Sequence, residues 1–497
     1  MFRKVLIANR GEIAVRVAQT LQQMGIVAAA VYSEADRGAV HVRAADEAYP
    51  LEGSSSAETY LRGDKIIEIA RRCGAEAIHP GYGFLSENAD FAQSCADAGF
   101  TFIGPTPPVI RAMGDKIVAK KTFADAGVPV VPGATLESGT FDEAKKCAKK
   151  IGYPVLIKAA AGGGGKGMRV VQKESDLAAA IEAAQREAGA AFGDGRVFLE
   201  KYLTKPRHVE FQIFGDTHGN VVHLFERECS IQRRHQKIIE ESPSPALTPE
   251  LRAQMGDAAV RAAQAIGYTN AGTVEFILDE SGEFYFLEVN TRLQVEHPVT
   301  EMTLGRDLVR AQILVAAGQP LLFSQDDLRQ DGHAIECRIY AEDAARGFLP
   351  SIGTILRYVA PIGGGLRIDS GVGEGSQISV HYDPMLAKLI AHGRTRREAL
   401  DKMLWALDRY VILGITTNID LLRAVIAHPE FAAGRLHTHF LETHDVLSSA
   451  PSVRPDAALI IAALAAQNGR VGPATHRDSV TRPSSGPWRA VGAWRAY

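Results

Sequence analysis

Short apolar runs alternate with amphipathic stretches along the first 113 residues of the chain. Runs rich in β-formers, such as KVLIAN and GIVAAAVY, are separated by stretches of helical periodicity that include Glu12–Met24 and Asp64–Cys73. This alternation predicts βαβ units around a parallel sheet. The strand-to-loop junctions carry Gly or Pro, as in HPGYG at 79–83, and ligands of such sheets bind beyond the carboxyl ends of the strands. Ordinary loop punctuation would place the same residues there, so both interpretations stay open.

The pattern changes beyond Gly114, where longer helices and paired strands follow. Lys116–Ala126 and Phe141–Ile151 have helical periodicity, and the strand YPVLIKAA leads through GGGGKG into a second strand, MRVVQ. The last part, with a short predicted helix at Asp456–Gln467, is rich in Ala, Pro, Ser and Arg, as is typical of a linker. The sequence therefore predicts a mixed α/β and α+β chain. Its predicted parts are a doubly wound parallel-sheet domain at 1–113, a central domain at 114–331, an α+β domain at 332–446 and a linker or tail at 447–497.

Composition and charge exclude several classes of protein. The 497 residues are 46% hydrophobic and 23% charged, as in globular enzymes, and the formal net charge of −3 gives no electrostatic reason to bind nucleic acid or an anionic membrane. The longest apolar run, at 457–466, is too short to span a bilayer, and the N-terminal apolar run is broken at Asn9 and Arg10. Five scattered cysteines without a C-x-x-C pair indicate a reducing compartment. We therefore expect a cytoplasmic protein without a membrane partner.

One polar row stands out in the segment FLEVNTRLQVEHP, at 286–298. Every second residue is polar, and in an extended chain these side chains share one face. The row consists of Glu288, Asn290, Arg292, Gln294 and Glu296. Most alternating strands simply have a solvated face. Two carboxylates, two amides and a guanidinium are instead the groups that hold a metal ion and a small anion, so we expect this row to form the floor of an active site.

The strand that precedes this row adds another carboxylate beside it. The strands TVEFIL and EFYFLEV flank the turn at 279–282. A four-residue loop places Leu278 opposite Glu283, hence Glu275 opposite Phe286, with Glu288 as the diagonal neighbour of Glu275 at about 7–8 Å. Two carboxylates so placed repel each other unless a cation lies between them. With Asn290 as a third oxygen ligand, the set predicts a Mg²⁺ or Mn²⁺ site.

The glycine-rich segment at 162–167 predicts a lid over a polyphosphate. It matches G-x-G-x-x-G, but a strand follows it where a dinucleotide-binding fold has a helix, and Lys166 precedes Gly167 where a P-loop has Ser or Thr. Four consecutive glycines in a plain hairpin would cost much ordering entropy, which favours a functional loop. Lys158 lies on the apolar strand beside it and requires an anionic partner. Lys116, at a predicted helix start, is a second candidate.

Two further polar stretches have a functional and an ordinary interpretation. Residues 232–237, QRRHQK, are either a solvated turn or a source of cations for a small acid. His208, Glu210 and Gln212 alternate in RHVEFQI, which predicts a second polar strand face in the same cleft. The stretch FLEKYL at 198–203 has the mixed character that suits a planar base, but spacing alone leaves that assignment open.

Several long motifs, in this order, resemble the biotin carboxylase component of biotin-dependent carboxylases, an ATP-grasp enzyme. They are ANRGEIA, AIHPGYGFLSEN, GPTPPVIRAMGDK, IKAAAGGGGKGMRVV, PRHVEFQI, QRRHQKIIEE and FLEVNTRLQVEHPVTE. The resemblance extends from about Phe2 to about Val446. It implies that the central domain is an ATP-grasp domain with a mobile glycine-rich lid at about 134–203. It also implies that MgATP phosphorylates bicarbonate and that the carboxyl group passes to N1′ of biotin on a carrier protein.

The resemblance also implies a role for each matching residue. ATP would be held by Lys116, Lys158, Gly164, Gly165, Glu200, Lys201, Tyr202, Leu203, His208, Gln232 and His235. The metal would be held by Glu275, Glu288 and Asn290. Bicarbonate would be held by Lys237, Arg292, Gln294 and the amide of Val295. The general base would be Glu296, the biotin enolate would be stabilised by Arg338, and the biotin pocket would be bordered by Tyr82 and Gly83.

Subtype and partners follow less directly. YDPMLAKLIAHG and LGITTNIDLLRAVIAHPEF look more like acyl-CoA carboxylase α chains, of the methylcrotonyl or propionyl kind, than the stand-alone bacterial subunit. No Met-Lys-Met biotinylation motif occurs, so we expect a separate biotin carrier, a carboxyltransferase subunit and a truncated or naturally short α chain. Gln19 and Gln23 replace a charged pair of the bacterial dimer, which leaves a homo-oligomer open. The competing interpretation is another ATP-grasp carboxylate–amine ligase.

Overall fold

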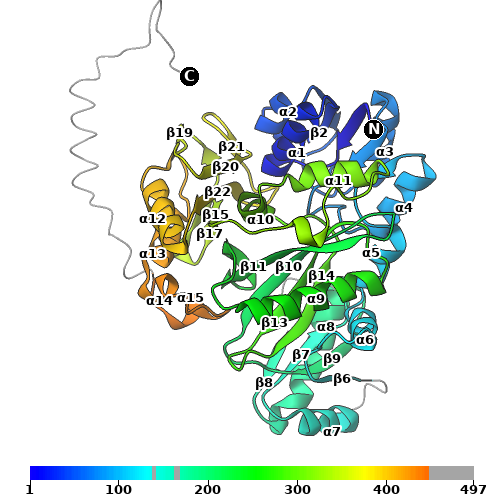
Figure 1. The fold of residues 1–497 in the computed structure, drawn as a ribbon, viewed down its shortest axis with the longest axis vertical. Helices are drawn as coiled ribbons and strands as arrows, with labels where there is room; N and C mark the ends of the chain where they lie inside the picture. Colours follow the sequence, from blue (N-terminus) through cyan, green and yellow to red (C-terminus); the bar gives the residue numbers. More distant parts are fainter. Residues whose placement is uncertain (137–140, 162–167, 447–497) are drawn as a thin grey trace, which may run out of the picture. The chain divides into compact units, whose positions relative to one another are not determined.

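The N-terminal sheet has five parallel strands in the order β3-β2-β1-β4-β5. Figure 1 draws this part of the chain in blue. The computed structural model describes residues 1–136, 141–161 and 168–446. The strands are β1 Lys4–Ile7, β2 Val27–Ser33, β3 Glu47–Leu51, β4 Ala77–His79 and β5 Thr101–Phe102, and the helices are α1 Gly11–Gln23, α2 Val40–Ala44, α3 Gly63–Cys73, α4 Ala89–Asp97 and α5 Pro107–Met113. The predicted parallel, doubly wound sheet is confirmed. Its strand order reverses between β1 and β4, and crevices at such points bind ligands.

A small four-stranded sheet, in the order β6-β9-β7-β8, follows in the chain. Its elements are β6 Gly133–Thr135, α7 Phe141–Ile151, β7 Val155–Ala159, β8 Arg169–Val171, α8 Leu177–Phe192 and β9 Val197–Lys201, and the preceding helix is α6 Lys116–Asp125. β7 and β8 pair antiparallel, as the flanks of the glycine-rich segment predict. The helices α7 and α8 bury alanines against the sheet and give this part a core of its own. Gly162–Gly167 lie outside the described residues.

The largest sheet has eight antiparallel strands in the order β14-β13-β10-β11-β12-β15-β22-β20. Its strands are β10 Arg207–Gly215, β11 Val221–Arg233, β12 Gln236–Ser242, β13 Asn270–Leu278, β14 Phe284–Asn290, β15 His333–Tyr340, β20 Leu366–Ser370 and β22 Met385–Gly393. Because β12 pairs with β15, the sheet continues without a break across the boundary predicted at 331/332. The residue limits of the predicted domains stay predictions.

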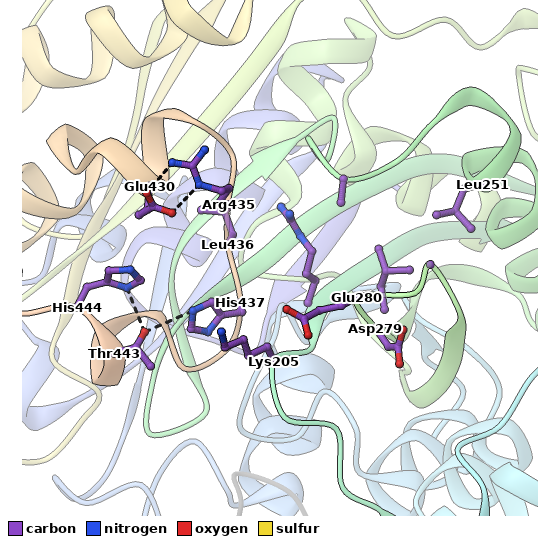
Figure 2. A pocket seen from close by; sticks show the side chains of 14 residues that line it. Lys205, Leu251, Asp279, Glu280, Glu430, Arg435, Leu436, His437, Thr443 and His444 are labelled. Carbon is purple, nitrogen blue, oxygen red and sulfur yellow. Dashed lines mark hydrogen bonds and ion pairs between the residues drawn. The ribbon is translucent and has the colours of Figure 1, made fainter.

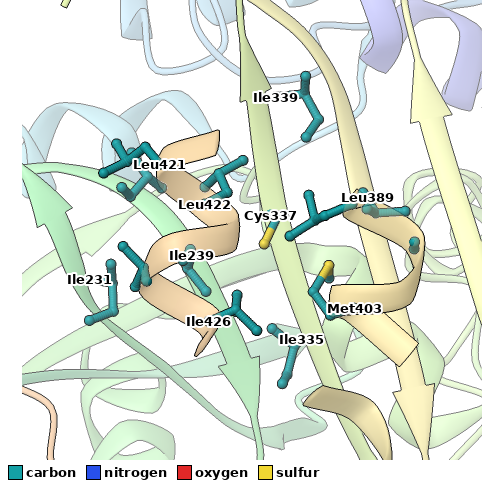
Figure 3. Close-up of a cluster of buried hydrophobic side chains, with 14 of the residues drawn as sticks. Ile231, Ile239, Ile335, Cys337, Ile339, Leu389, Met403, Leu421, Leu422 and Ile426 are labelled. Carbon is teal, nitrogen blue, oxygen red and sulfur yellow. The ribbon is translucent and has the colours of Figure 1, made fainter. Parts of the chain in front are cut away.

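Helices cover both faces of this sheet. The helices of this part of the chain are α9 Pro249–Ala265, α10 His297–Leu304, α11 Leu308–Ala316, α12 Arg396–Leu407, α13 Ile419–Ala427, α14 Pro429–Ala432 and α15 Phe440–Thr443. The C-terminal part also has the short strands β16 Glu342–Asp343, β17 Leu349–Pro350, β18 Gly353–Thr354, β19 Arg357–Val359, β21 Gln377–Ile378 and β23 Val411–Leu413. Figure 3 shows Ile335, Cys337 and Ile339 of β15 in one buried cluster with residues of α12 and α13. Strand alternation therefore directs Glu336 and Arg338 to the opposite face, on which α10 packs.

Among the described residues, the helices are all too short or too polar to cross a membrane.

Candidate active site

The hairpin of β13 and β14 brings Glu275 directly opposite Glu288. The predicted register is wrong by one residue near the turn, where Leu278 pairs with Phe284 and Phe286 pairs with Phe276. A β-bulge then shifts the register again between Phe276 and Glu275. Because a bulge adds a residue on one strand, the two carboxylates become direct neighbours on the sheet, closer than the diagonal pair expected from the sequence.

The polar row does not stay extended. β14 ends at Asn290, and Glu296 is already the N-cap of α10, with φ −82° and ψ 12°. The expectation of one strand face is therefore wrong for the last three residues. The pairing of β14 with β13 stops at Asn290, opposite Thr273, although β13 itself extends to Asn270. The row still converges through side chains. Arg292 donates from Nη2 to Asn290 Oδ1 at 3.0 Å and from Nη1 to Gln294 Oε1 at 2.7 Å.

Lys237 lies at the centre of three carboxylates from different elements. Its Nζ atom lies 2.5 Å from Glu210 on β10, 2.8 Å from Glu275 on β13 and 2.7 Å from Glu296. Burial alone would lower the pKa of Lys237, but these three carboxylates outweigh burial and raise that pKa well above its usual value. Gln294 donates from Nε2 to Glu275 Oε1 at 3.1 Å, so the amide of the polar row joins the same cluster.

Glu296 lies between Lys237 and Arg338 and is completely buried. Arg338 donates from Nη2 to Glu296 Oε2 at 2.9 Å and from Nε to Glu240 Oε1 at 2.6 Å. Burial would raise the pKa of Glu296, but the charges of Lys237, Arg338 and Arg227 lower it well below the usual carboxyl range. Glu296 is therefore an ionised carboxylate inside the protein, held in that form by the neighbouring cations.

A second lysine cluster lies where α6 meets the small sheet. Lys158 Nζ lies 3.2 Å from Glu200 Oε2, Lys120 contacts the other oxygen of the same carboxylate, and Lys116 Nζ lies 3.1 Å from Glu288 Oε2. Burial and the neighbouring ammonium groups lower the pKa of Lys158 to about 8 and that of Lys120 to about 6. The cluster holds more ammonium groups than its single central carboxylate balances, which favours an anionic ligand.

The remaining predicted ATP residues lie along β9 to β12. His208 Nε2 is 2.8 Å from Glu275 Oε2, and Gln232 Nε2 is 2.6 Å from His208 Nδ1, so these two side chains buttress a predicted metal ligand. The ammonium group of Lys201 donates to the carbonyls of Gly152 and Tyr153, at 2.9 and 3.3 Å. His235 lies in the turn between β11 and β12, at φ +66°. Tyr202 bonds His439 through its hydroxyl at 3.2 Å, and Leu203 follows it. Gly164 and Gly165 lie outside the described residues.

Tyr82 and Gly83 follow β4 at the point where the strand order of the N-terminal sheet reverses. Asn9, beyond the end of β1, donates from Nδ2 to the carbonyl of Tyr82 at 2.8 Å and so ties the two loops together. Gly83 has a φ of +70°, which a side chain would strain. Lys388 of β22 lies 5.7 Å from the centre of the Tyr82 ring. The Tyr82 ring therefore lies beside β22 of the large sheet.

Three family models match consecutive parts of the chain. They describe the N-terminal domain of biotin carboxylase (residues 1–110), the ATP-binding domain of the carbamoyl-phosphate synthase L chain (115–323) and the C-terminal domain of biotin carboxylase (336–443). Biotin carboxylase 1 of Bacillus subtilis is 52% identical over 450 residues, which are 90% of this chain and 100% of that protein. The chain belongs to the biotin carboxylase family.

Other members of the family differ in length. The mitochondrial methylcrotonoyl-CoA carboxylase subunit alpha of Arabidopsis thaliana is 54% identical over 443 residues, but this chain spans only 60% of it. Among solved structures, the biotin carboxylase domain dimer of Hydrogenobacter thermophilus 2-oxoglutarate carboxylase superposes with a TM-score of 0.86 at 51% identity, over 89% of this chain and 98% of that one. That crystal contains MgADP, ADP and bicarbonate. The architecture described above is thus that of biotin carboxylase domains.

The structure adds residues to this biotin carboxylase site that the sequence did not reveal. Lys120 lies one helical turn after Lys116 in α6, a spacing that a search for cations on one helix face would have detected. Glu87 accepts from Arg292 Nε at 2.8 Å across a separation of 205 residues, and Glu240 and Lys388 reach the site from β12 and β22. No local pattern signals such distant contacts.

A separate pocket of about 660 Å³ lies between the β13–β14 turn and the C-terminal helices of the biotin carboxylase chain (Figure 2). Its carboxylates are Asp279, Glu280 and Glu430, and Glu430 forms an ion pair with Arg435 at 2.6 Å. The lining also includes His437, whose Nε2 lies 3.4 Å from the Thr443 hydroxyl. Its described lining shares no residue with the predicted site, and its charges are mixed rather than of one sign.

Proposed function

We propose that this chain is a biotin carboxylase that carboxylates carrier-bound biotin with bicarbonate and MgATP. The observation that carries the proposal is the buried, ionised Glu296 between Lys237 and Arg338, with a lysine-rich anion site beside it. Bicarbonate is a poor nucleophile, and removal of its proton by a nearby carboxylate increases its reactivity toward the γ-phosphate. The family membership and the bicarbonate in the Hydrogenobacter structure support the same assignment.

Glu275, Glu288 and Asn290 fit a divalent cation. The two carboxylates face each other on adjacent strands, and the Asn290 amide lies beside them. Its Nδ2 donates to Glu275 Oε1 at 2.8 Å and its Oδ1 accepts from Arg292 at 3.0 Å, so the amide would turn to present Oδ1 to a cation. In this structure Lys237 and Lys116 balance the two charges. An all-oxygen set of this kind suits Mg²⁺ or Mn²⁺, which would neutralise phosphate charge during transfer. We propose these three residues as the metal ligands.

The nucleotide would lie over the second lysine cluster. We propose that Lys116 and Lys158 contact its phosphates, together with Gly164 and Gly165 of the glycine-rich segment. The base and ribose would be held by the stretch Glu200–Leu203 and by His208, Gln232 and His235. The small sheet β6–β9 is the proposed lid, and a closed lid would protect carboxyphosphate, which is labile in water.

The proposed binding sites for bicarbonate and for biotin would both border Glu296. Lys237, Arg292, Gln294 and the Val295 amide would hold bicarbonate, while Glu296 takes its proton. Arg338 would stabilise the negative charge that develops on the biotin enolate, since a guanidinium supplies fixed positive charge in a desolvated site. Tyr82 and Gly83 would border the biotin ring.

We further propose that the chain works with a biotin carboxyl carrier and a carboxyltransferase as the α-type component of an acyl-CoA carboxylase. The longer Arabidopsis relative is named as a methylcrotonoyl-CoA carboxylase subunit, which makes a branched acyl-CoA the first acceptor to examine. We also propose a cytoplasmic location, because all five cysteines are free thiols, as expected in a reducing compartment.

The proposal is tested by ADP formation with MgATP, bicarbonate and free biotin. We expect ADP formation that requires bicarbonate and increases when biotin is added. The competing function, an ATP-grasp carboxylate–amine ligase, would instead show ADP formation that requires an amine acceptor. ATP turnover that is equal after removal of bicarbonate would reject the biotin carboxylase assignment.

A further inference from the structure

The segment Thr291–Glu296 contains most of the proposed bicarbonate ligands but belongs to no strand. It lies between the end of β14 and the first residue of α10. Side chains from inside and outside the segment bond its main chain. Glu87 accepts from the Thr291 amide at 3.0 Å, and Arg292 Nη1 donates to the Leu293 carbonyl at 3.2 Å. A loop that must present ligands to a small anion is thus held by side chains where a strand would be held by its ladder.

Two buried nitrogen groups hold the next two carbonyls. His297 Nδ1 lies 2.8 Å from the Gln294 carbonyl oxygen, and Lys388 Nζ donates to the Val295 carbonyl at 2.8 Å. Both side chains are completely buried. Peptide groups are planar, so fixing the Gln294 oxygen also fixes the direction of the Val295 N–H. In the same way, fixing the Val295 oxygen orients the peptide that leads into Glu296.

Lys388 has no other hydrogen bond as short as this one among the described contacts. Its Nζ atom lies 3.3 Å from Glu12 Oε2 on α1 and 3.7 Å from Asp369 Oδ2 on β20. Asp369 is already paired through both oxygens with Arg367, at 2.8 Å each. A fully buried ammonium is costly unless it has a role or strong partners. Its position joins β22, the N-terminal helix α1 and the bicarbonate segment.

We propose that Lys388 and His297 are positioning residues for bicarbonate, which they serve by fixing the two consecutive peptide groups between Gln294 and Glu296. This inference rests on the proposed biotin carboxylase function. Neither side chain touches bicarbonate. Together they direct the Val295 amide toward the anion and hold the Glu296 carboxylate between Lys237 and Arg338. This positioning matters because a small displacement of reacting groups lowers the catalytic rate strongly.

Lys388→Met in the full chain tests the first half. Methionine has nearly the same length but cannot donate, so we expect the KM for bicarbonate to increase about tenfold or more while the KM for MgATP stays within about twofold. The matched control is Lys402→Met. Lys402 Nζ likewise donates to a main-chain carbonyl at 2.9 Å, but this carbonyl belongs to His392 on β22 and lies outside the bicarbonate segment. We expect this control to leave both KM values unchanged.

Variants of Glu12 distinguish two effects of the Lys388→Met change, the loss of the buried charge and the loss of the contact to the Val295 carbonyl. Glu12→Gln keeps the Lys388 contact and should leave the KM for bicarbonate unchanged. Burial raises the pKa of Glu12 to about 7, and loss of Lys388 favours its neutral form further. The double variant Glu12→Gln, Lys388→Met carries neither charge and should keep the high KM. A normal bicarbonate KM in the double variant would overturn the proposal, because charge imbalance would then explain the single variant.

His297 has its own matched pair. The amide nitrogen of Asn lies where Nδ1 of His lies, so His297→Asn should retain a bicarbonate KM close to wild type, whereas His297→Leu should raise it about as much as Lys388→Met. Equal KM values in the two His297 variants would refute the role of His297. The proposed function itself fails only if the wild-type chain shows no bicarbonate-dependent ADP formation. If the wild type is active and Lys388→Met has an unchanged KM for bicarbonate, the inference about Lys388 is wrong but the proposed function still stands.

Discussion

The two lysine clusters of this molecule have opposite charge balance. Around Lys237, one ammonium group contacts Glu210, Glu275 and Glu296, and its pKa is raised. Around Glu200, the reverse holds, because Lys120 and Lys158 share one carboxylate and the pKa of each lysine is lowered. The same residue type is thus stabilised in its charged form at one place and destabilised in that form at the other.

The difference indicates what each cluster binds. A group of buried carboxylates gains from an added cation, and crowded ammonium groups gain from an added anion. In the proposed complex, the metal lies at the carboxylate-rich side and the phosphates at the lysine-rich side, so one MgATP satisfies both. The first cluster would then serve the chemistry of bicarbonate and the second would serve nucleotide binding. Three measurements test this division.

Glu296→Gln should have the largest effect. It removes the base but keeps the shape of the side chain, so we expect bicarbonate-dependent ADP formation to fall by about 10²- to 10⁴-fold while nucleotide affinity stays within about twofold. Steady-state kinetics and calorimetric titration with ADP measure the two quantities. The matched control is Glu336→Gln. Burial raises the pKa of Glu336 well above its usual value, which favours the neutral form of this fully buried carboxyl, so its amide should preserve activity. A similar loss in both variants would mean that Glu296 does not act as the base.

Lys158→Met should act on the other side of the division. Losing one charge-assisted contact to phosphate in a buried site weakens the nucleotide by about 1.5–3 kcal/mol, which is roughly a tenfold to hundredfold increase in Kd. The KM for bicarbonate should change little. Lys145→Met is the control, since Lys145 forms an exposed ion pair with Glu174 at 2.6 Å on the same small domain. If Lys158→Met raised the bicarbonate KM as much as the nucleotide Kd, the two clusters would not have separate roles.

Nucleotide binding should also take up protons, which is the smallest effect. Lys120 and Lys158, with pKa values of about 6 and about 8, are partly neutral in the free protein at pH 7.5, and a bound phosphate raises both values. We expect about one proton taken up per ADP at pH 7.5, increasing toward two at pH 9 and decreasing as the pH falls below 6. Calorimetric titration with ADP in buffers of different ionisation enthalpy measures the number of protons taken up. Lys120→Met should remove most of the uptake at pH 7.5, whereas proton release on binding would contradict the lowered pKa values.

The local pattern of the sequence determined the helices and strands and the kinds of side chain that form the site. α6 begins at Lys116 because Asp115 caps it, with Oδ1 accepting from the Ile117 and Val118 amides. The parallel N-terminal sheet and the polar face of β10 follow from hydrophobic periodicity, which each segment carries by itself. Motif resemblance then assigned a role to each residue of the row 288–296.

Only the tertiary structure decided how these residues meet. A bulge placed Glu275 opposite Glu288, and a bulge leaves no signal in a two-residue alternation. The strand ended at Asn290 although its partner strand continues to Asn270, and Glu87 and Lys388, which hold the segment beyond it, come from distant parts of the chain. Periodicity fixes which way a side chain points along its own element, whereas contacts between elements depend on how the whole chain packs.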